Sequence, residues 1–531
     1  MKKKTLFFGL IALLWMMNTI GASATDLVVN GTTVSIAGGD YENVIVKNSG
    51  TLKVTGSLTA QNLTVVTLGT LNVAKAVKAG SVLFDGTVTV SGNLSCSEII
   101  VQGGTTTFLG VDNFVTNTTT VVGQLVALGT WDSDNIVILN GGAFKIYPND
   151  SNVPKSGLLF IHAKNIDIQK GGSINGDSAG NDPRGKGHDW YSNCSGGGGG
   201  GPGGRGYWNS SGGGNEGQAF GSAFTYESFM GGAGGYYGGG GLLIEAEESL
   251  IINGNITANG TTSSNGEVAG GAGGGILIRS LKIVLNGKLS ANGGNGIGNS
   301  GGGGGGRIKI FYNGDIANLN SHVSVLAGTP NAGPGTIYRD FIPRVTELVA
   351  PLPEAMVTNG SFSFRFTVED LSGPLDGRPD TISPVIEMSS DGFKTIAYRF
   401  DQNEAVAGWS KILYYSGDTV EYVPRTPIKM GTYAWRVMVA DGSLSSRYTA
   451  PRNLAVDTAL DQTYSMTLYM TPTIVVRGTA GSYRIDWVSS LDESTNWSEL
   501  TILKVESEPA FYFDTSAIGE PKRFYRTVLL Q

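Results

Sequence analysis

Aromatic side chains that could bind a ligand gather in one glycine-rich stretch of the chain. They form three adjacent pairs among glycines: Trp190 and Tyr191, Tyr207 and Trp208, and Tyr236 and Tyr237. Aromatic rings held on a rigid edge can stack on the faces of sugars, and they also recur at protein interfaces. We expect these six residues to bind a ligand. The alternative is that the rings plug the glycine-rich stretch onto the structure beneath it.

Residues that could cleave a polysaccharide are few. Such chemistry needs two carboxylates across the scissile bond, or a basic group that takes up a proton. The candidates are Asp132, Asp134, Asp177, Asp182, Asp189, Arg184, Lys186 and His188. Arg307-Ile308-Lys309 resembles a short motif of the polygalacturonases, but their Asp-Asp and Gly-His-Gly elements are missing. We expect no catalytic residue, and a polysaccharide lyase or hydrolase is the alternative.

Metal, nucleotide and nucleic-acid sites are not predicted. Asp177, Asp182 and Asp189 could hold calcium, but the spacings of EF-hand and nonapeptide calcium sites are absent. The run from Gly196 satisfies GxGxxG, yet no strand–turn–helix unit surrounds it and no phosphate-binding Lys-Ser/Thr follows. The net charge of -7 argues against a nucleic-acid partner. We therefore expect no cofactor.

The first 24 residues have the pattern of a secretory signal peptide. Three lysines precede an apolar stretch, and Ala22-Ser23-Ala24 supplies the small residues of a cleavage site. We expect membrane contact only through this cleaved segment. In an exported chain, Cys96 and Cys194 could form one disulfide, but the sequence does not show that they are close.

An internal repeat predicts the fold of residues 25–154. Glycines recur about every 18 residues, and short alternating stretches such as Thr51–Val54, Thr70–Val73 and Thr87–Val90 follow them. Alternating β-branched residues indicate strands with one buried face, and a fixed period indicates stacked units. We therefore predict an all-β chain built on a parallel β-helix of either hand. Separate antiparallel hairpins are the alternative.

The repeat continues with insertions over residues 155–340. Related strand phrases recur at Gly172–Gly176, Gly254–Gly260 and Gly287–Gly293, and after each one the chain runs through glycine before a strand resumes. Glycine-rich excursions should therefore leave one corner of successive coils and lie side by side. More than half of the 81 glycines lie between residues 171 and 306.

Tethering lowers the entropic cost of ordering these glycines, and the lack of Cβ atoms lets their backbones approach closely. We expect a packed layer of extended glycine strands, with flexible loops as the alternative. The composition resembles the polyglycine packing of some phage tail-fibre adhesins and of the anaplastic lymphoma kinase receptor.

Two small β-sandwich-like modules are predicted at residues 341–456 and 457–531. The first contains Tyr433-Ala434-Trp435 on an alternating aromatic strand, and the second contains Tyr483 and Trp487 on another. The first resembles bacterial immunoglobulin-like or fibronectin-type-III-like modules, in which Tyr433 and Trp435 would be core and corner residues. The C-terminal one is similar to modules at the C-termini of secreted proteins of environmental Gram-negative bacteria.

The whole chain resembles a broad class of secreted or cell-surface β-helix proteins with glycine-rich repeats. That class implies a structural, adhesive or matrix role. We expect a non-catalytic protein, secreted or on the outer surface of a Gram-negative bacterium. Its expected partner is a surface or matrix polysaccharide or another cell-surface protein.

Overall fold

A computed structural model describes residues 25–182, 195–201, 203, 217–221, 228–234, 236–264, 268–313, 319–358, 362–370, 381–402, 408–441, 444–457, 472–491, 496–506, 509–517 and 522–530. The predicted signal peptide, residues 1–24, lies outside the described residues. The chain divides into two compact units, residues 1–456 and 457–531.

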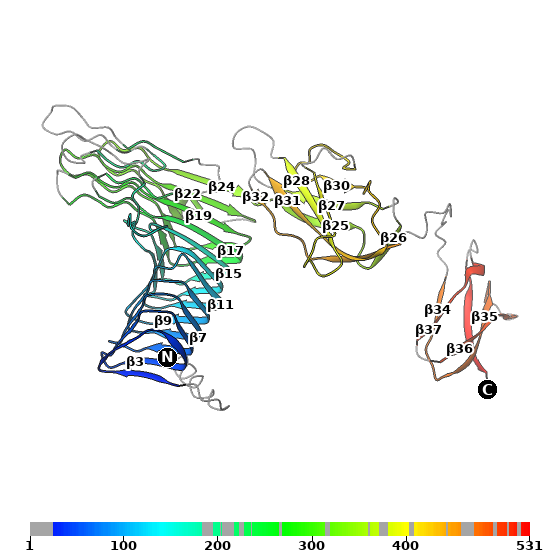
Figure 1. Ribbon diagram of the computed structural model, residues 1–531. Coiled ribbons are helices and arrows are strands. Elements are labelled where there is room, and N and C mark those ends of the chain that lie inside the picture. The colour runs from blue at the N-terminus through cyan, green and yellow to red at the C-terminus, as the bar shows by residue number, and fades with distance from the viewer. Residues whose placement is uncertain are drawn as a thin grey trace, which may run out of the picture. The chain divides into compact units, whose positions relative to one another are not determined.

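Two long parallel sheets dominate the first unit, and consecutive strands of the repeat alternate between them (Figure 1). Sheet A runs in the order β1 (Leu27–Asn30), β3 (Gly39–Lys47), β5 (Leu58–Val65), β7 (Val77–Phe84), β9 (Leu94–Val101), β11 (Asp112–Val121), β13 (Gly129–Ile138), β15 (Leu158–Ile168), β17 (Gly241–Ile252), β19 (Gly275–Ser280), β22 (Arg307–Tyr312) and β24 (Thr336–Phe341), with β20 (Ile283–Leu285) beside β17.

Sheet B runs in the order β2 (Thr33–Ile36), β4 (Thr51–Val54), β6 (Thr70–Val73), β8 (Thr87–Val90), β10 (Thr105–Phe108), β12 (Gln124–Ala127), β14 (Ala143–Ile146), β16 (Ser173–Asn175), β18 (Asn255–Thr257), β21 (Lys288–Ser290) and β23 (Val323–Ser324); the short helix α2 (Leu319–His322) precedes β23. Neighbouring strands pair in parallel, as β4, β6 and β8 do. The predicted parallel β-helix is confirmed, and the antiparallel hairpin alternative is wrong.

Inward side chains form the core of the coils. Leu52, Leu71 and Val88 occupy the same register position in three successive coils and are fully buried. Further along, Trp131 packs edge-on against Phe108 and Phe144, with ring centroids 5.5 and 5.4 Å away. Period-two alternation places every second residue inside, so that each coil buries its apolar side chains on those of the coil before it.

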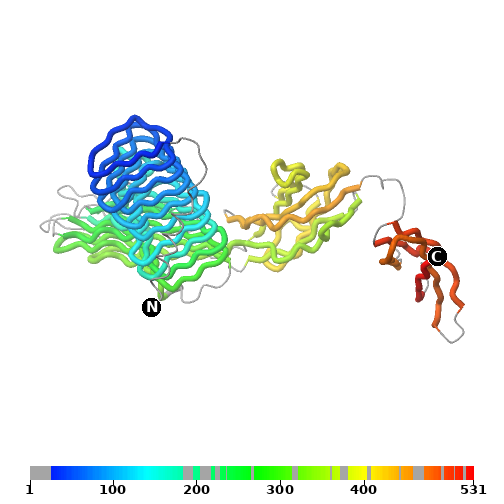
Figure 2. Tube along the Cα trace, turned by 90° about the horizontal axis from the view of Figure 1, so that it is seen from below, coloured from blue at the N-terminus to red at the C-terminus, as the bar shows by residue number. Residues whose placement is uncertain are grey.

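The glycine-rich excursions leave between a sheet B strand and the next sheet A strand. They run from β16 to β17, from β18 to β19 and from β21 to β22. In Figures 1 and 2 the described parts of these segments extend side by side from one flank of the coil. The prediction that the insertions share one corner is confirmed.

Backbone hydrogen bonds join these segments in several directions. The Gly197 N–H donates to Gly270 O at 3.2 Å, and the Gly304 N–H donates to Gly197 O at 2.8 Å. The Gly232 N–H donates to the neighbouring Gly198 O at 2.9 Å. A strand in a pleated sheet has neighbours on two sides only. The segment 196–201 bonds three other segments here, so the described excursions form a layer held together by backbone hydrogen bonds.

Close approach explains why this layer needs glycine. A Cβ added to Gly303 would overlap the carbonyl of Gly271, and one added to Gly271 would overlap the carbonyl of Tyr237. Backbone carbonyls cannot rotate away as a long side chain can. The segments can therefore pack this tightly only without side chains.

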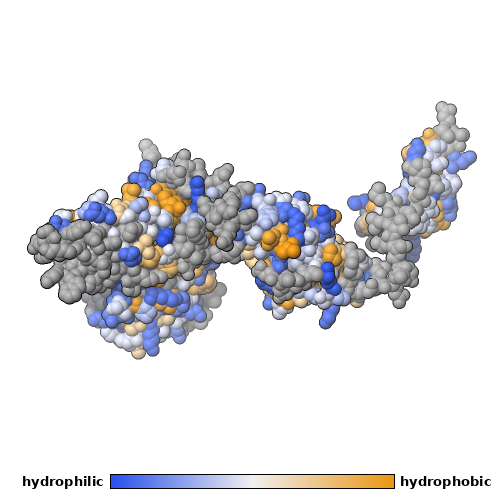
Figure 3. All heavy atoms as spheres, turned by 90° about the horizontal axis from the view of Figure 1, so that it is seen from above, coloured by the Kyte–Doolittle hydropathy of each residue, from blue (hydrophilic) through white to orange (hydrophobic). Residues whose placement is uncertain are grey.

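Two antiparallel sheets with an aromatic core between them follow β24 in the first unit (Figure 3 shows their outer surface). One sheet contains β25 (Arg344–Ala350), β27 (Phe364–Glu369) and β30 (Thr419–Tyr422), and the other contains β26 (Ala355–Thr358), β33 (Arg452–Asp457), β31 (Gly431–Asp441), β28 (Ile382–Ser389), β29 (Tyr398–Asp401) and β32 (Leu444–Ser445). Trp435 is fully buried against Phe364, with ring centroids 5.0 Å apart. We call this part the sandwich module.

The second unit is a small antiparallel β module. It contains β34 (Thr473–Val476) paired with β37 (Ala510–Phe513), the sheet β36 (Ser498–Val505), β35 (Gly481–Val488) and β38 (Phe524–Leu530), and the 3-10 helix η2 (Thr515–Ala517). Its apolar core is small, and a buried ionic network supplements it. The Asp514 carboxylate accepts hydrogen bonds from Arg523 at 2.9 Å and from Tyr525 at 2.8 Å. Burial alone would raise the pKa of Asp514, but these partners and Ser516 lower it.

Candidate functional site

Two of the six predicted ligand-binding aromatics, Tyr236 and Tyr237, lie in the described part of the glycine-rich layer. Trp190, Tyr191, Tyr207 and Trp208 lie outside the described residues. The Tyr237 side chain is 54% exposed, whereas the Tyr236 hydroxyl is hydrogen-bonded to Ser264. The backbone of the pair is fixed on both sides, because Tyr236 N–H donates to Ala269 O at 3.2 Å and Tyr237 O accepts from Thr261 N–H at 3.0 Å. Tyr237 is thus an exposed ring on an ordered backbone.

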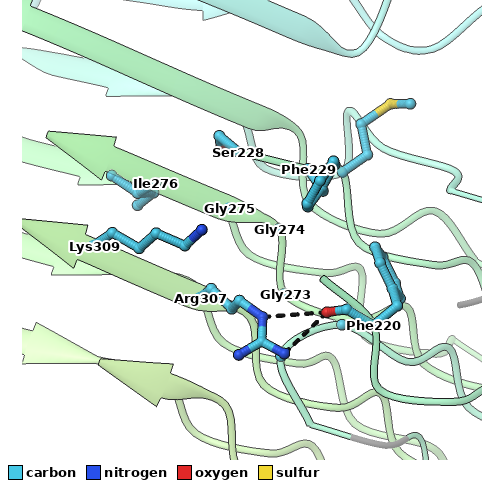
Figure 4. A pocket seen from close by; sticks show the side chains of 12 residues that line it. Phe220, Ser228, Phe229, Gly273, Gly274, Gly275, Ile276, Arg307 and Lys309 are labelled. Atoms are coloured by element: carbon cyan, nitrogen blue, oxygen red, sulfur yellow. Dashed lines mark hydrogen bonds between the residues drawn. The ribbon is translucent and has the colours of Figure 1, made fainter. Parts of the chain in front are cut away.

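Two other aromatics of the layer face its root, where the excursions rejoin sheet A. Phe220 and Phe229 lie with ring centroids 6.3 Å apart and line a small pocket with Ser228, Arg307 and Lys309 (Figure 4). The cavity measures about 20 Å³, which is room for about one water. These two rings pack the layer onto the coil. For them, the alternative that the aromatic rings plug the glycine-rich stretch onto the structure beneath it is the one that the structure shows.

Arg307 fastens the layer at this root. Its guanidinium donates to Phe220 O at 3.0 Å (Figure 4). It also donates to Gly221 O at 2.9 Å, and its Nη1 donates to Thr336 Oγ1 at 2.7 Å. Burial lowers the pKa of Arg307. The Arg307-Ile308-Lys309 motif therefore places its first side chain on backbone carbonyls of the long excursion.

Asp177 begins a ladder of polar side chains along the later coils. Its Oδ1 accepts the Asn259 N–H at 2.6 Å, Asn259 Oδ1 accepts the Asn292 N–H at 2.8 Å, and Asn292 Oδ1 accepts the Leu326 N–H at 2.7 Å. Each side chain thus pairs a backbone amide of the next coil. Asp182 is buried, and Asp189, Arg184, Lys186 and His188 lie outside the described residues.

A group of titratable side chains lies on the outer face of sheet A. Asp132 and His162 are paired by strand register, with Asp132 Oδ1 2.7 Å from His162 Nδ1. His162 Nε2 lies 3.2 Å from Glu247 Oε1. Asp134 pairs with Lys164 at 2.9 Å, and its hydrogen bond and charge raise the pKa of that ammonium. Both ring nitrogens of His162 therefore face carboxylates.

This group also contacts the sandwich module. Glu247 Oε2 lies 2.5 Å from Arg447, and Arg279, which pairs with Glu245 at 3.5 Å, donates to Ser445 O. Beside these polar contacts, buried apolar side chains from both parts form one cluster: Leu277, Phe311, Ile342 and Leu444.

The sequence candidates for polysaccharide cleavage include Asp132 and Asp134 but not His162. The pairing had a sequence signal. The inward residues Trp131, Ile161 and Ile244 are in register on three neighbouring strands. Asp132, His162 and Glu245, respectively, are the residues that directly follow them. Aligning the strands by these inward residues would have placed the three polar side chains in one row.

The Cys96 thiol points into the core of the coil. Burial, and to a lesser degree the charge of Glu98, raises its pKa to about 12. Cys194 lies outside the described residues, so its disulfide with Cys96 stays a prediction.

Comparisons with protein-family models, with curated proteins and with solved structures found no match to the chain. Within the described ranges, no three His, Cys, Asp or Glu residues are grouped so that they could hold a metal ion. No helix in that same part of the chain has the length and apolar character needed to cross a membrane.

Proposed function

We propose that this chain is an exported, non-catalytic structural or adhesive protein that binds a polysaccharide of a cell surface or matrix. Its glycine-rich layer is the proposed binding surface, and the outer surface of a Gram-negative bacterium or the extracellular space is the proposed location. The coil supplies a rigid support for this surface.

The exposed ring of Tyr237 on the hydrogen-bonded layer is the observation that supports this proposal. A ring whose backbone is already fixed loses little conformational freedom when a ligand binds, so that more of the contact energy appears as affinity. The same layer also carries polar side chains, since Thr261 Oγ1 donates to Ser178 and Asn295 Oδ1 accepts from the Thr329 N–H.

Corner tyrosines support the resemblance of the two C-terminal modules to immunoglobulin-like or fibronectin-type-III-like domains. Tyr433 OH donates to Lys429 O at 3.1 Å, four residues upstream, and Tyr483 OH donates to Thr479 O at 3.0 Å in the same pattern. A tyrosine that bonds backbone a few residues upstream is typical of such sandwiches. Modules of this kind serve in the proposed role as spacers or adhesive units.

A glycan array probed with the mature chain tests the proposal. We expect binding that falls on Tyr237→Ala and on Trp190→Ala and Trp208→Ala, with unchanged thermal stability. The Tyr422→Phe variant, which changes a buried aromatic of the sandwich module, should bind as the wild type does. Absence of binding to every glycan would refute the proposal.

A polysaccharide-degrading enzyme is the other candidate, and the Asp132–His162 pair on an outer sheet face is what favours it. Release of oligosaccharides from pectin or alginate by the purified chain, abolished by Asp132→Asn, would establish this alternative. We expect no release, since both His162 nitrogens already face carboxylates.

A further inference from the structure

Strand register places two ranks of side chains on the outer face of sheet A between β11 and β17. One rank contains Phe114, Asp132, His162 and Glu245, and the other contains Thr130, Phe160 and Leu243. Neighbouring strands lie about 4.8 Å apart, and residues two apart on a strand are separated by about 6.6 Å. The two ranks therefore form a patch large enough for consecutive sugar rings.

The two ends of this patch differ in chemistry. Over the rank of Phe160 lies an open groove of about 340 Å³, lined largely by apolar side chains that include Leu158 and Leu243. Over the rank of His162 lies a polar pocket of about 150 Å³. The rings of Phe160 and His162 connect the two, with centroids 6.2 Å apart.

Two aromatic rings flank the acceptors of the patch. Phe114 points outward from sheet A, and it is 52% exposed. Phe160 lies two strands further along the same face. Two strand spacings and an offset of two residues along the strand separate them by about 12 Å. Asp132 lies between them. One carboxylate oxygen bonds His162, and no hydrogen bond to the other is found within the described part of the chain.

The charge of the patch favours a neutral polymer over an acidic one. Carboxylates outnumber basic side chains in and around the patch: Asp112, Asp132, Asp134, Glu245, Glu247 and Glu248 stand against Lys155, Lys164, Arg279 and Arg447. An excess of negative charge repels acidic polymers, whereas carboxylates accept hydrogen bonds from hydroxyl groups.

We propose that this patch is a second glycan-binding site, which holds an extended neutral polysaccharide. Sugar rings stack on Phe114 and Phe160, and their hydroxyl groups donate to Asp132 and Glu245. The site shares its ligand class with the proposed function but none of its residues.

Affinity electrophoresis of the mature chain tests this site. Gels would contain a neutral polymer (xyloglucan, galactomannan or mixed-linkage glucan) or an acidic one (pectate or alginate). We expect retardation by a neutral polymer and none by the acidic ones. Phe114→Ala and Phe160→Ala should each weaken the affinity about tenfold, which is the loss expected for one aromatic contact. Asp132→Asn should weaken it less, because an amide oxygen still accepts a hydrogen bond.

Leu68→Ala is the matched control, because Leu68 is 73% exposed on a distant early coil. Its affinity should equal that of the wild type. The site is refuted if the acidic polymers retard the chain more strongly, if no neutral polymer retards it, or if Phe114→Ala and Phe160→Ala migrate as Leu68→Ala does. Loss on Tyr237→Ala with full retention on both Phe variants would refute this site and leave the proposed function standing.

Discussion

In the regular coils, residues 25–154, inward side chains stack on one another, whereas the coils of residues 155–340 also carry a layer built largely of glycine backbone. Leu52, Leu71 and Val88 show the first arrangement, in which burial of apolar area stabilises each coil on the next. Gly197, Gly270 and Gly304 show the other, in which backbone amides bond to carbonyls of neighbouring segments.

The difference shows what each arrangement tolerates. When a buried side chain is replaced by a smaller one, the core loses contacts, but the hydrogen bonds between the strands are kept. A backbone layer has no such reserve, because an added Cβ meets a carbonyl, as at Gly303 and Gly271. The hydrophobic contribution of glycine is also negligible, so that satisfied hydrogen bonds and tethering at the coil must offset the large entropic cost of ordering it.

The largest effect is expected for Gly303→Val. The new side chain would overlap the Gly271 carbonyl and force two segments apart. We expect a loss of more than about 4 kcal/mol in the stability of the layer. Thermal unfolding and amide exchange of the layer would measure it. Gly417→Asn, at a turn with φ +87° and no atom within 4 Å of the added Cβ, should change little. Equal effects of the two changes would contradict the close-packed layer.

A smaller effect is expected for Leu71→Ala in the regular coils. The cavity left between Leu52 and Val88 should cost about 2–5 kcal/mol, with backbone pairing retained. Denaturant unfolding followed by circular dichroism checks this value. Val66→Ala, at a side chain that is 39% exposed, is the comparison and should cost less than about 1 kcal/mol.

A further step down is expected for Asn259→Ala in the polar ladder. The Asn292 N–H would lose its partner, at a cost of about 1 kcal/mol because water can reach this half-buried amide. The same measurement on Asn286→Ala, whose side-chain contact is exposed, should show a smaller change. A neutral result for both variants would mean that the ladder aligns the coils without stabilising them.

The smallest response is expected from the Cys96 thiol. With a pKa raised to about 12 by burial, it should resist iodoacetamide at pH 8 until the chain unfolds.

Because the folded pKa lies above the unfolded one, this thiol favours the native state below pH 9.0, and that contribution is lost as the pH rises toward 12. Mass spectrometry of the Cys96 peptide measures how fast iodoacetamide alkylates this thiol in the folded chain. Rapid alkylation there would show that the coil interior is open.

The sequence predicted the coils well, because strands that bury one face carry a period-two pattern. Thr51–Val54, Thr70–Val73 and Thr87–Val90 are three strands of sheet B with the predicted bounds. For this reason the sequence pattern indicated the sheet B strand of each coil. The sheet A strands are longer than their apolar runs, as β5 (Leu58–Val65) shows.

The partners within the glycine layer could not be predicted. Polyglycine carries no side-chain pattern that selects one register over another, so the pairing of Gly197 with Gly270 and Gly304 depends on the tethers at the coil. Asp132 and His162 were missed as a pair for another reason. They are 30 residues apart, which exceeds the period of about 18, because extra residues intervene between β14 and β15.

Native-state hydrogen exchange of the glycine amides tests the central claim most directly. We expect Gly197, Gly232, Gly273 and Gly303 to exchange as slowly as amides of the adjoining strands β17 and β19, because each donates a hydrogen bond within the layer. Exchange of these glycines at the rate of an unstructured chain, with β17 and β19 still protected, would contradict the account.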